Sequence, residues 1–166
     1  MGVPIAVLAI AAPSGGANPG AHDSASCGAL ARGLIKQTKV YRDTPADFHR
    51  YVQPWDAICH DFTGDGRKDV AFGILSGGTG GAFRFAVFRR TAQRGGGLAG
   101  RYVKMTERGH GSKTSLQRSG RRLKVINPVY RPSDGNCCPS GGVTVRTYRF
   151  TEAEIIYVGK HRVGPR

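Results

Sequence analysis

The nine residues 61–69 carry side chains that could bind a metal cation. Acidic or hydroxyl groups occupy the first, third, fifth and ninth positions of this segment, as Asp61, Thr63, Asp65 and Asp69. Gly66 at the sixth position permits the sharp turn that brings successive oxygen atoms inward around a hard cation such as Ca²⁺. Arg67 at the seventh position would add its backbone carbonyl. The spacing predicts a structural Ca²⁺ site.

The same segment also fits a turn that holds itself together without metal. In a helix–loop–helix calcium site the twelfth position is a bidentate Glu, whereas this chain has Phe72 there, so no carboxylate closes the shell from that side. An Asp- and Gly-rich turn can be stabilised by side-chain-to-backbone hydrogen bonds alone. The register of the oxygen-bearing residues favours the metal, because such a turn needs only one or two acidic residues.

The motif Asp-x-Thr-Gly-Asp-Gly-x-x-Asp, followed by Val-Ala-Phe, resembles the calcium loop of FG-GAP/VCBS repeats in integrin-type propellers and bacterial secreted proteins. The match covers roughly residues 57–75 and occurs once. No internal repeat of propeller length accompanies it, so a single loop does not predict a propeller.

Four further segments occur in an order similar to that of small secreted or lipid-anchored actinobacterial proteins of the LppP/LprE type, largely of unknown function. They are residues 77–83, 127–130, 134–142 and 146–150. The two resemblances imply Asp61, Thr63, Asp65 and Asp69 as metal ligands and Cys137 and Cys138 as disulfide partners. They imply no catalytic residue.

The N-terminal segment has the pattern of an export signal. Residues 3–12 form an apolar run of ten, followed by small and turn-forming residues, which predicts a signal peptide over residues 1–21 with cleavage near Ala17 or Ala21. A single exported domain would then span residues 22–166. No Lys or Arg precedes the run, which leaves the true start open, and an apolar tail on a cytosolic protein is the alternative. No later segment approaches the ~20 apolar residues of a membrane-spanning helix.

Four cysteines, Cys27, Cys59, Cys137 and Cys138, fit an exported and oxidised protein. A bridge between adjacent cysteines is strained. We therefore expect Cys137 and Cys138 each to pair with Cys27 or Cys59, with the assignment open. A zinc–thiolate site is disfavoured, since Cys-x₂-Cys spacing is missing.

The chain is strongly basic, with 25 Lys and Arg against 11 Asp and Glu and a net charge of +14. Between residues 84 and 124 only Glu107 is acidic. The candidate anion-binding residues are Arg84, Arg89, Arg90, Arg121 and Arg122. Such a surface attracts polyanions within about 8 Å at physiological salt, and an anionic cell-wall polymer or a protein is the expected partner. The alternative is that the charge serves only solubility.

The sequence predicts an α+β, mainly β fold: an N-terminal helix or helices, then an antiparallel meander of about six strands with helical cover on one face. We expect a helix over 27–38 and a short helix, or else an extended segment, over 44–51. Strands are expected over 70–75, 82–90, 101–108, 121–130, 142–150 and 154–163.

Other motifs do not support catalysis. The glycines of 78–81 precede a β pattern, so a hairpin turn explains them better than a nucleotide loop. No Gly-x-Ser-x-Gly or His-Glu-x₂-His pattern is present. Phe83 and Phe85 are expected to share a core face, which leaves Phe88 alone among arginines and disfavours nucleic-acid binding.

The sequence thus predicts an exported, non-enzymatic envelope or extracellular module with a structural calcium loop and a basic surface. One alternative is a secreted metal-dependent hydrolase of anionic polymers, with His60 beside the cation. The other is a basic nucleic-acid-binding domain, marked by an exposed Phe88.

Overall fold

The computed structural model describes residues 19–78, 80–92, 101–109, 111–135 and 137–164. The helical elements are α1 (Pro19–Leu34), the 3₁₀ turn η1 (Ile35–Gln37), α2 (Lys39–Asp43) and the 3₁₀ helix η2 (Ala46–Tyr51). The strands are β1 (Val52–His60), β2 (Asp69–Ser76), β3 (Ala82–Arg90), β4 (Tyr102–Gly109), β5 (Ser115–Ser119), β6 (Arg122–Pro128), β7 (Val143–Phe150) and β8 (Ile155–Val163).

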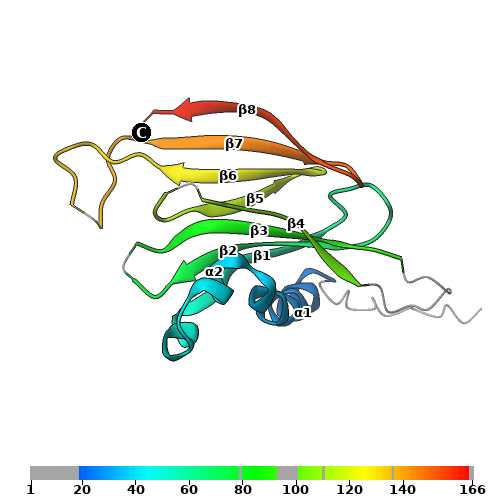
Figure 1. Ribbon diagram of the computed structural model, residues 1–166. Helices are drawn as coiled ribbons and strands as arrows, with labels where there is room; N and C mark the ends of the chain where they lie inside the picture. The colour runs from blue at the N-terminus through cyan, green and yellow to red at the C-terminus, as the bar shows by residue number, and fades with distance from the viewer. Residues whose placement is uncertain (1–18, 79, 93–100, 110, 136, 165–166) are drawn as a thin grey trace, which may run out of the picture.

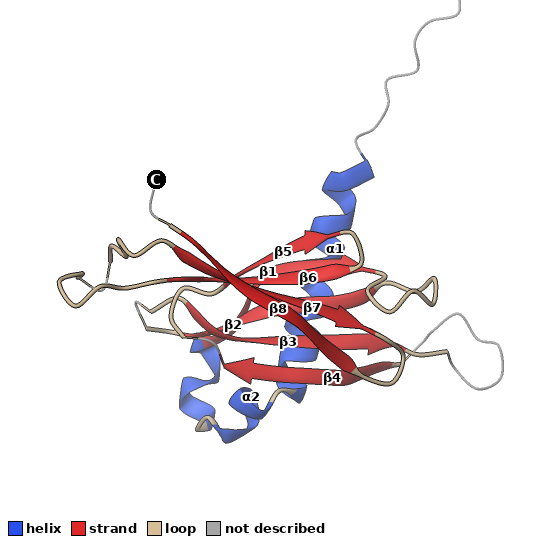
Figure 2. Cartoon of the chain, turned by 90° about the horizontal axis from the view of Figure 1, so that it is seen from above, coloured by secondary structure: helices blue, strands red, loops and turns tan. Residues whose placement is uncertain are grey.

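The strands form two four-stranded sheets. The first sheet has the order β1-β2-β3-β4 and the second the order β5-β6-β7-β8, and every neighbouring pair is antiparallel. The helices lie against the first sheet, and the second sheet stacks on its other side, with no described helix beyond it (Figure 1). Seen from above, β7 and β8 run across the strands of the first sheet (Figure 2). The outer face of the second sheet is therefore open to solvent.

Two hydrophobic clusters hold these layers together. One lies between the helices and the first sheet and includes Ala31, Leu34, Phe72 and Phe88. The other lies between the two sheets and includes Phe62, Phe85, Leu123, Val125, Tyr148 and Phe150. Strand β6 illustrates the pattern, because Leu123 and Val125 are fully buried while their neighbours Arg122, Lys124 and Ile126 are exposed or half-buried. Residues along a strand alternate between buried and solvent-exposed positions when only one face of the sheet is covered.

The predicted class, mainly β with N-terminal helices, is confirmed, but the single six-stranded meander is wrong. The structure has eight strands in two sheets, and the sequence patterns missed β1 and β5. Pro54 and a register shift between Trp55 and Ile58 interrupt the alternation of β1. Strand β5 has only five residues and a single buried apolar side chain, Leu116.

The helix boundaries also differ from the prediction. Helix α1 begins at Pro19 rather than at residue 27, and the predicted short helix over 44–51 is the 3₁₀ segment η2. The capped helix is α2, where Thr38 Oγ1 accepts from the Tyr41 N–H. The Glu107 carboxylate of β4 also accepts the N–H groups of Lys39 and Val40, at 2.5 and 2.9 Å, which anchors α2 on the first sheet.

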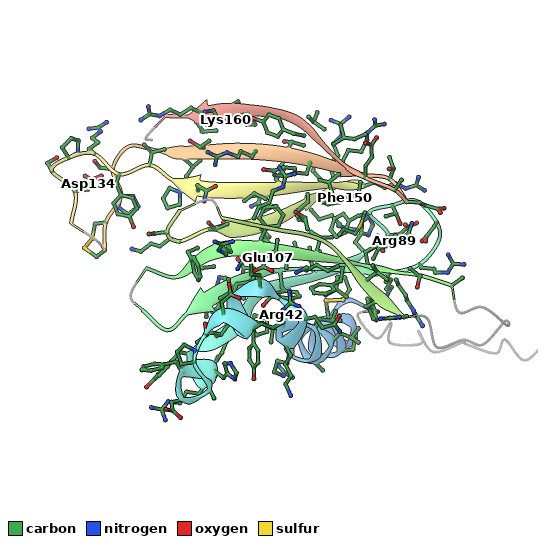
Figure 3. The ribbon with its side chains drawn as sticks, viewed as in Figure 1. Arg42, Arg89, Glu107, Asp134, Phe150 and Lys160 are labelled. Atoms are coloured by element: carbon green, nitrogen blue, oxygen red, sulfur yellow. A yellow bond between two sulfur atoms is a disulfide. The ribbon has the colours of Figure 1, made fainter. Side chains whose placement is uncertain are left out.

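The disulfides join Cys27 to Cys59 and Cys137 to Cys138. The prediction that Cys137 and Cys138 would each pair with Cys27 or Cys59 is therefore wrong. Cys27 lies on α1, which packs on β1, and its Cα is 5.7 Å from that of Cys59. The loop that contains Asp134 and both later cysteines lies away from that helix (Figure 3), so proximity selects the local pairs. The predicted signal peptide falls almost wholly outside the described residues. No described helix combines the length and apolarity needed to cross a membrane.

Candidate functional site

The loop between β1 and β2 contains the predicted cation ligands, and each carboxylate in it is held by hydrogen bonds. Asp61 Oδ1 accepts the N–H groups of Gly64 and Asp65 at 2.6 and 3.1 Å, and its Oδ2 accepts the Gly66 N–H at 3.0 Å. Burial opposes ionisation of Asp61, but these donors and Arg121 outweigh it, so the pKa of Asp61 lies below its ordinary value. Asp61 therefore acts as the anionic centre of a backbone turn.

Asp69 closes the loop from its other end. It is fully buried at the start of β2, and its Oδ2 accepts the N–H groups of Phe62 and Thr63 at 3.0 and 3.1 Å and the Thr63 hydroxyl at 3.2 Å. Its Oδ1 accepts the Arg90 N–H of β3 at 3.1 Å. Burial nevertheless raises the pKa of Asp69. Asp69 thus connects both strands to the loop from inside the protein.

The remaining loop side chains pair with one another. Asp65 Oδ1 accepts the Arg67 N–H at 2.9 Å, and Asp65 Oδ2 forms an ion pair with the Arg67 guanidinium at 3.1 Å. The Arg121 guanidinium of the β5–β6 turn lies over the loop, because a Cβ on Gly64 would be 2.7 Å from Arg121 Nη1. The loop thus contacts the β5–β6 turn of the second sheet through the positively charged side chain of Arg121.

These contacts bear directly on the predicted metal site. Among the described residues, no three His, Cys, Asp or Glu side chains lie together in a way that could hold a metal ion. The three carboxylates point to separate N–H donors rather than to one shared position, and Thr63 donates its hydroxyl to Asp69. Calcium binding stays a prediction of the sequence.

His60, predicted as a neighbour of the cation, faces the second sheet instead. Its Nδ1 lies 3.2 Å from Arg118 Nη1. Burial, followed by the charge of Arg118, lowers the pKa of His60, and the guanidinium, which can only donate, makes Nδ1 the acceptor. A neutral ring nitrogen held by a guanidinium is a structural acceptor, and nothing in this contact orients a reacting group.

The five predicted anion-binding residues do not form one surface. Arg84 and Arg89 belong to β3, where Arg84 lies 5.9 Å from the Phe83 ring and Arg89 forms an ion pair with Glu152 at 3.7 Å. Arg90 ends β3 and donates its N–H to Asp69. Arg121 and Arg122 lie on the second sheet and its turn. The structure therefore divides the basic stretch between the two sheets.

The second sheet gathers cations, of which the sequence patterns singled out only Arg122 as a candidate anion-binding residue. Its four strands hold seven Lys and Arg and no Asp or Glu: Arg118, Arg122, Lys124, Arg146, Arg149, Lys160 and Arg162. This count excludes the connecting turns, which contain Asp134, Glu152 and Glu154. The signal in the sequence was the absence of acids from two consecutive β patterns, 121–130 and 142–150, and from all but the first residue of the third, 154–163.

Cross-strand register places like charges directly opposite one another. Arg122 of β6 pairs with Arg149 of β7, and both side chains are exposed. Their neighbours in the strands, Leu123 and Tyr148, pack in the core, so the two arginines lie on the outer face of the sheet. Lys124 shares that face. We call Arg122, Lys124 and Arg149 the basic face.

A second like-charged pair lies on the other side of the same sheet. Arg146 of β7 is opposite Lys160 of β8, and Arg146 donates to Asn127 Oδ1 at 2.9 Å. Lys160 lies on the edge strand β8 (Figure 3). Like charges directly opposite in a sheet destabilise it. Two such pairs indicate that this sheet retains cations at a cost to its own stability.

Phe88, the marker for a nucleic-acid platform, is buried. It stacks on Phe72, with ring centroids 5.7 Å apart, beneath the helices. Alternation holds along β3, because Phe85 and Val87 pack between the two sheets while Ala86 and Phe88 pack under the helices, so both faces of this strand are covered. The arginine face of β3 therefore lacks the predicted exposed aromatic residue.

The chain was compared with protein families, curated proteins and solved structures. No family model matches it. No curated protein matches it either, and no solved structure does.

Proposed function

We propose that this protein is a non-enzymatic module that works outside the cytoplasm and binds an anionic polymer through the second sheet. The single observation that carries the proposal is the Arg122–Arg149 pair on an open face whose strands contain no acid. A bound polyanion would neutralise a repulsion that the fold otherwise leaves in place.

The basic face has the properties that an anion-binding surface needs. Arg122 and Arg149 are exposed, and in the described part of the chain neither they nor Lys124 form an ion pair or a side-chain hydrogen bond. Arginine guanidinium groups can bind carboxylate, sulfate or phosphate groups in bidentate fashion. Repeated anions along a polymer would meet several cations at once, which favours a polymer over a single small anion.

The cysteines support the proposed compartment. All four are in disulfides, and disulfides persist mainly outside the reducing cytosol. Anionic polymers of the cell envelope are the polyanions that such a protein would meet. The apolar run at residues 3–12 agrees with export.

Binding of polygalacturonate at several salt concentrations tests this function. The variant Arg122→Ala/Lys124→Ala/Arg149→Ala should bind more weakly, with a dependence of log K on log salt that is shallower by roughly 2. The matched control is Arg32→Ala/Lys36→Ala/Arg42→Ala, which removes the same charge from exposed positions of the helical layer. Equal weakening by both triple variants would assign the effect to net charge and refute a specific face.

A further inference from the structure

A small open hollow lies where the edges of the two sheets meet, near the β2–β3 turn. Its volume is about 220 Å³, and it is lined by Trp55, Leu75, Gly81, Ala82, Lys113, Thr114 and Ser115. Strands β1 and β5, which are the neighbouring edges of the two sheets, contribute Trp55 and Ser115. Most of the lining is apolar, and the polar groups come from one side, residues 113–115.

Trp55 is the only tryptophan of the chain, and half of it (51 %) is exposed. The residue paired with it on β2 is Gly73, where a Cβ would lie 3.1 Å from the Cβ of Ala82 and 3.6 Å from that of Trp55. The missing side chain at Gly73 therefore lets Ala82 and Trp55 approach each other. The indole ring of Trp55 therefore offers a flat, exposed surface beside Ala82.

The backbone around this hollow is strained at two points. Asp56 and Lys113, with φ of 47° and 53°, are the non-glycine residues with positive φ in the described part of the chain. Asp56 follows Trp55 within the bulge of β1, and Lys113 lines the hollow. Bulges re-aim side chains, and backbone strain of this kind clusters at functional sites. Lys113 lines the hollow from the connection between β4 and β5, and Asp56 lies in β1 next to the lining residue Trp55.

The chemistry of the walls indicates the kind of ligand. The indole face can stack on a ring, and Lys113 lines the same hollow, with its ammonium group 5.9 Å from the centre of the Tyr130 ring. Lys113 Nζ donates to the Cys137 carbonyl at 2.5 Å, and an ammonium group has two further protons to donate. The volume is below the ~300 Å³ at which drug-sized pockets begin, so it suits a single ring.

We infer that this hollow is a subsite for one acidic sugar ring of an anionic polysaccharide. The ring would stack on Trp55 and direct its carboxylate to Lys113. This assignment rests on the proposed function, and it names the polymer class. Strand β5 starts at the hollow with Ser115, and its Gln117 pairs with Lys124 of the basic face. A chain bound at Trp55 can thus continue along the second sheet.

The sole tryptophan makes the test direct, because intrinsic fluorescence reports on Trp55 alone. Titration with tetragalacturonate should shift the emission of the wild-type protein, whereas the neutral cellotetraose should not. Lys113→Asn removes the charge with a residue that tolerates positive φ, and it should weaken tetragalacturonate binding about tenfold, the equivalent of 1.4 kcal/mol.

Labelled tetragalacturonate, followed by anisotropy, tests the contribution of the ring itself. Trp55→Ala should lose most of the affinity, while Phe48→Ala should not, since Phe48 is a comparably exposed aromatic residue (56 %) on η2 outside the hollow. Thermal unfolding of both variants confirms that they are folded.

The possible results separate this subsite from the proposed function. If polygalacturonate binds through the basic face but Trp55→Ala binds equally well and the wild-type emission is unchanged, the subsite is refuted and the function stands. An equal response to cellotetraose refutes the acidic specificity. A stronger emission shift with the oligonucleotide dT₈ refutes the sugar assignment in favour of a stacked base. Failure of every anionic polymer to bind refutes both proposals.

Discussion

Replacing Asp69 by alanine should destabilise the protein strongly, because this buried carboxylate accepts hydrogen bonds from the start of the loop and from β3. Its loss leaves the N–H groups of Thr63 and Arg90 without their acceptor. The Phe62 N–H keeps a partner, since it also donates to the His60 carbonyl at 2.9 Å. Each orphaned donor costs about 1–3 kcal/mol. Burial raises the pKa of Asp69, so removal of the charge returns part of this cost.

We therefore expect Asp69→Ala to lower the free energy of unfolding by about 2–4 kcal/mol. With an m-value of about 2 kcal/mol/M, the urea midpoint should fall by about 1–2 M. The assay is urea unfolding followed by Trp55 fluorescence and circular dichroism. Asp43→Ala, which removes an exposed i,i+4 ion pair with Lys39, is the control and should cost less than about 1 kcal/mol.

Running the same assay with Ca²⁺ and with a chelator separates the two possible roles of Asp69. A hydrogen-bonding role predicts the full loss in the presence of chelator. A loss that appears only with Ca²⁺ would show that the carboxylate acts as a metal ligand and would refute our reasoning. If Asp69→Ala leaves the urea midpoint unchanged both with Ca²⁺ and with chelator, the hydrogen-bonding role is refuted as well.

Three further changes have defined outcomes. Replacing both cysteines of the bridge between α1 and β1 by serine should cost about 3–4 kcal/mol by loop entropy for a separation of 32 residues, as measured by thermal or urea unfolding under non-reducing conditions. Gly64→Ala should cost about 1–2 kcal/mol, since Gly64 has a φ of 87° and Arg121 lies over it; an unaltered stability would contradict that approach. Hydrogen bonds from the side chain and then the backbone of Ser140, and from the backbone of Arg131, lower the pKa of Asp134. The order of that loop should therefore persist from neutral pH down through the ordinary range of an aspartate and be lost only as the pH falls through the lowered pKa. The Ser140 amide signal in an NMR titration checks this, and a midpoint at the ordinary value would contradict it.

The sequence revealed local elements better than it revealed their assembly. Strand β3 was predicted with its observed bounds, because nine residues of alternating and aromatic character leave little choice. The position of the β2–β3 turn followed from its glycines. The division into two sheets did not follow from periodicity, since β5 is short and β1 is interrupted by a bulge.

The candidate site was predictable only in part. The loop motif indicated which carboxylates would converge on one segment, but not that backbone N–H groups would take up their oxygen atoms. The net charge indicated a basic surface, yet the pairing of Arg122 with Arg149 depends on strand register between segments separated by a long loop. Trp55 gave no signal in the sequence, because its exposure depends on a bulge and on Gly73 of the next strand.

The placement of the two disulfides has a mechanical consequence. One fastens α1 to β1 and the other closes a single dipeptide, so neither crosses from one sheet to the other. If the protein is pulled by its ends, strands β8, β7, β6 and β5 can detach from the sheet in turn without the breaking of a disulfide. The helix and the edge strand beneath it stay fastened throughout. A tether attached at the C-terminus would thus lengthen under load while the segment between Cys27 and Cys59 remained crosslinked.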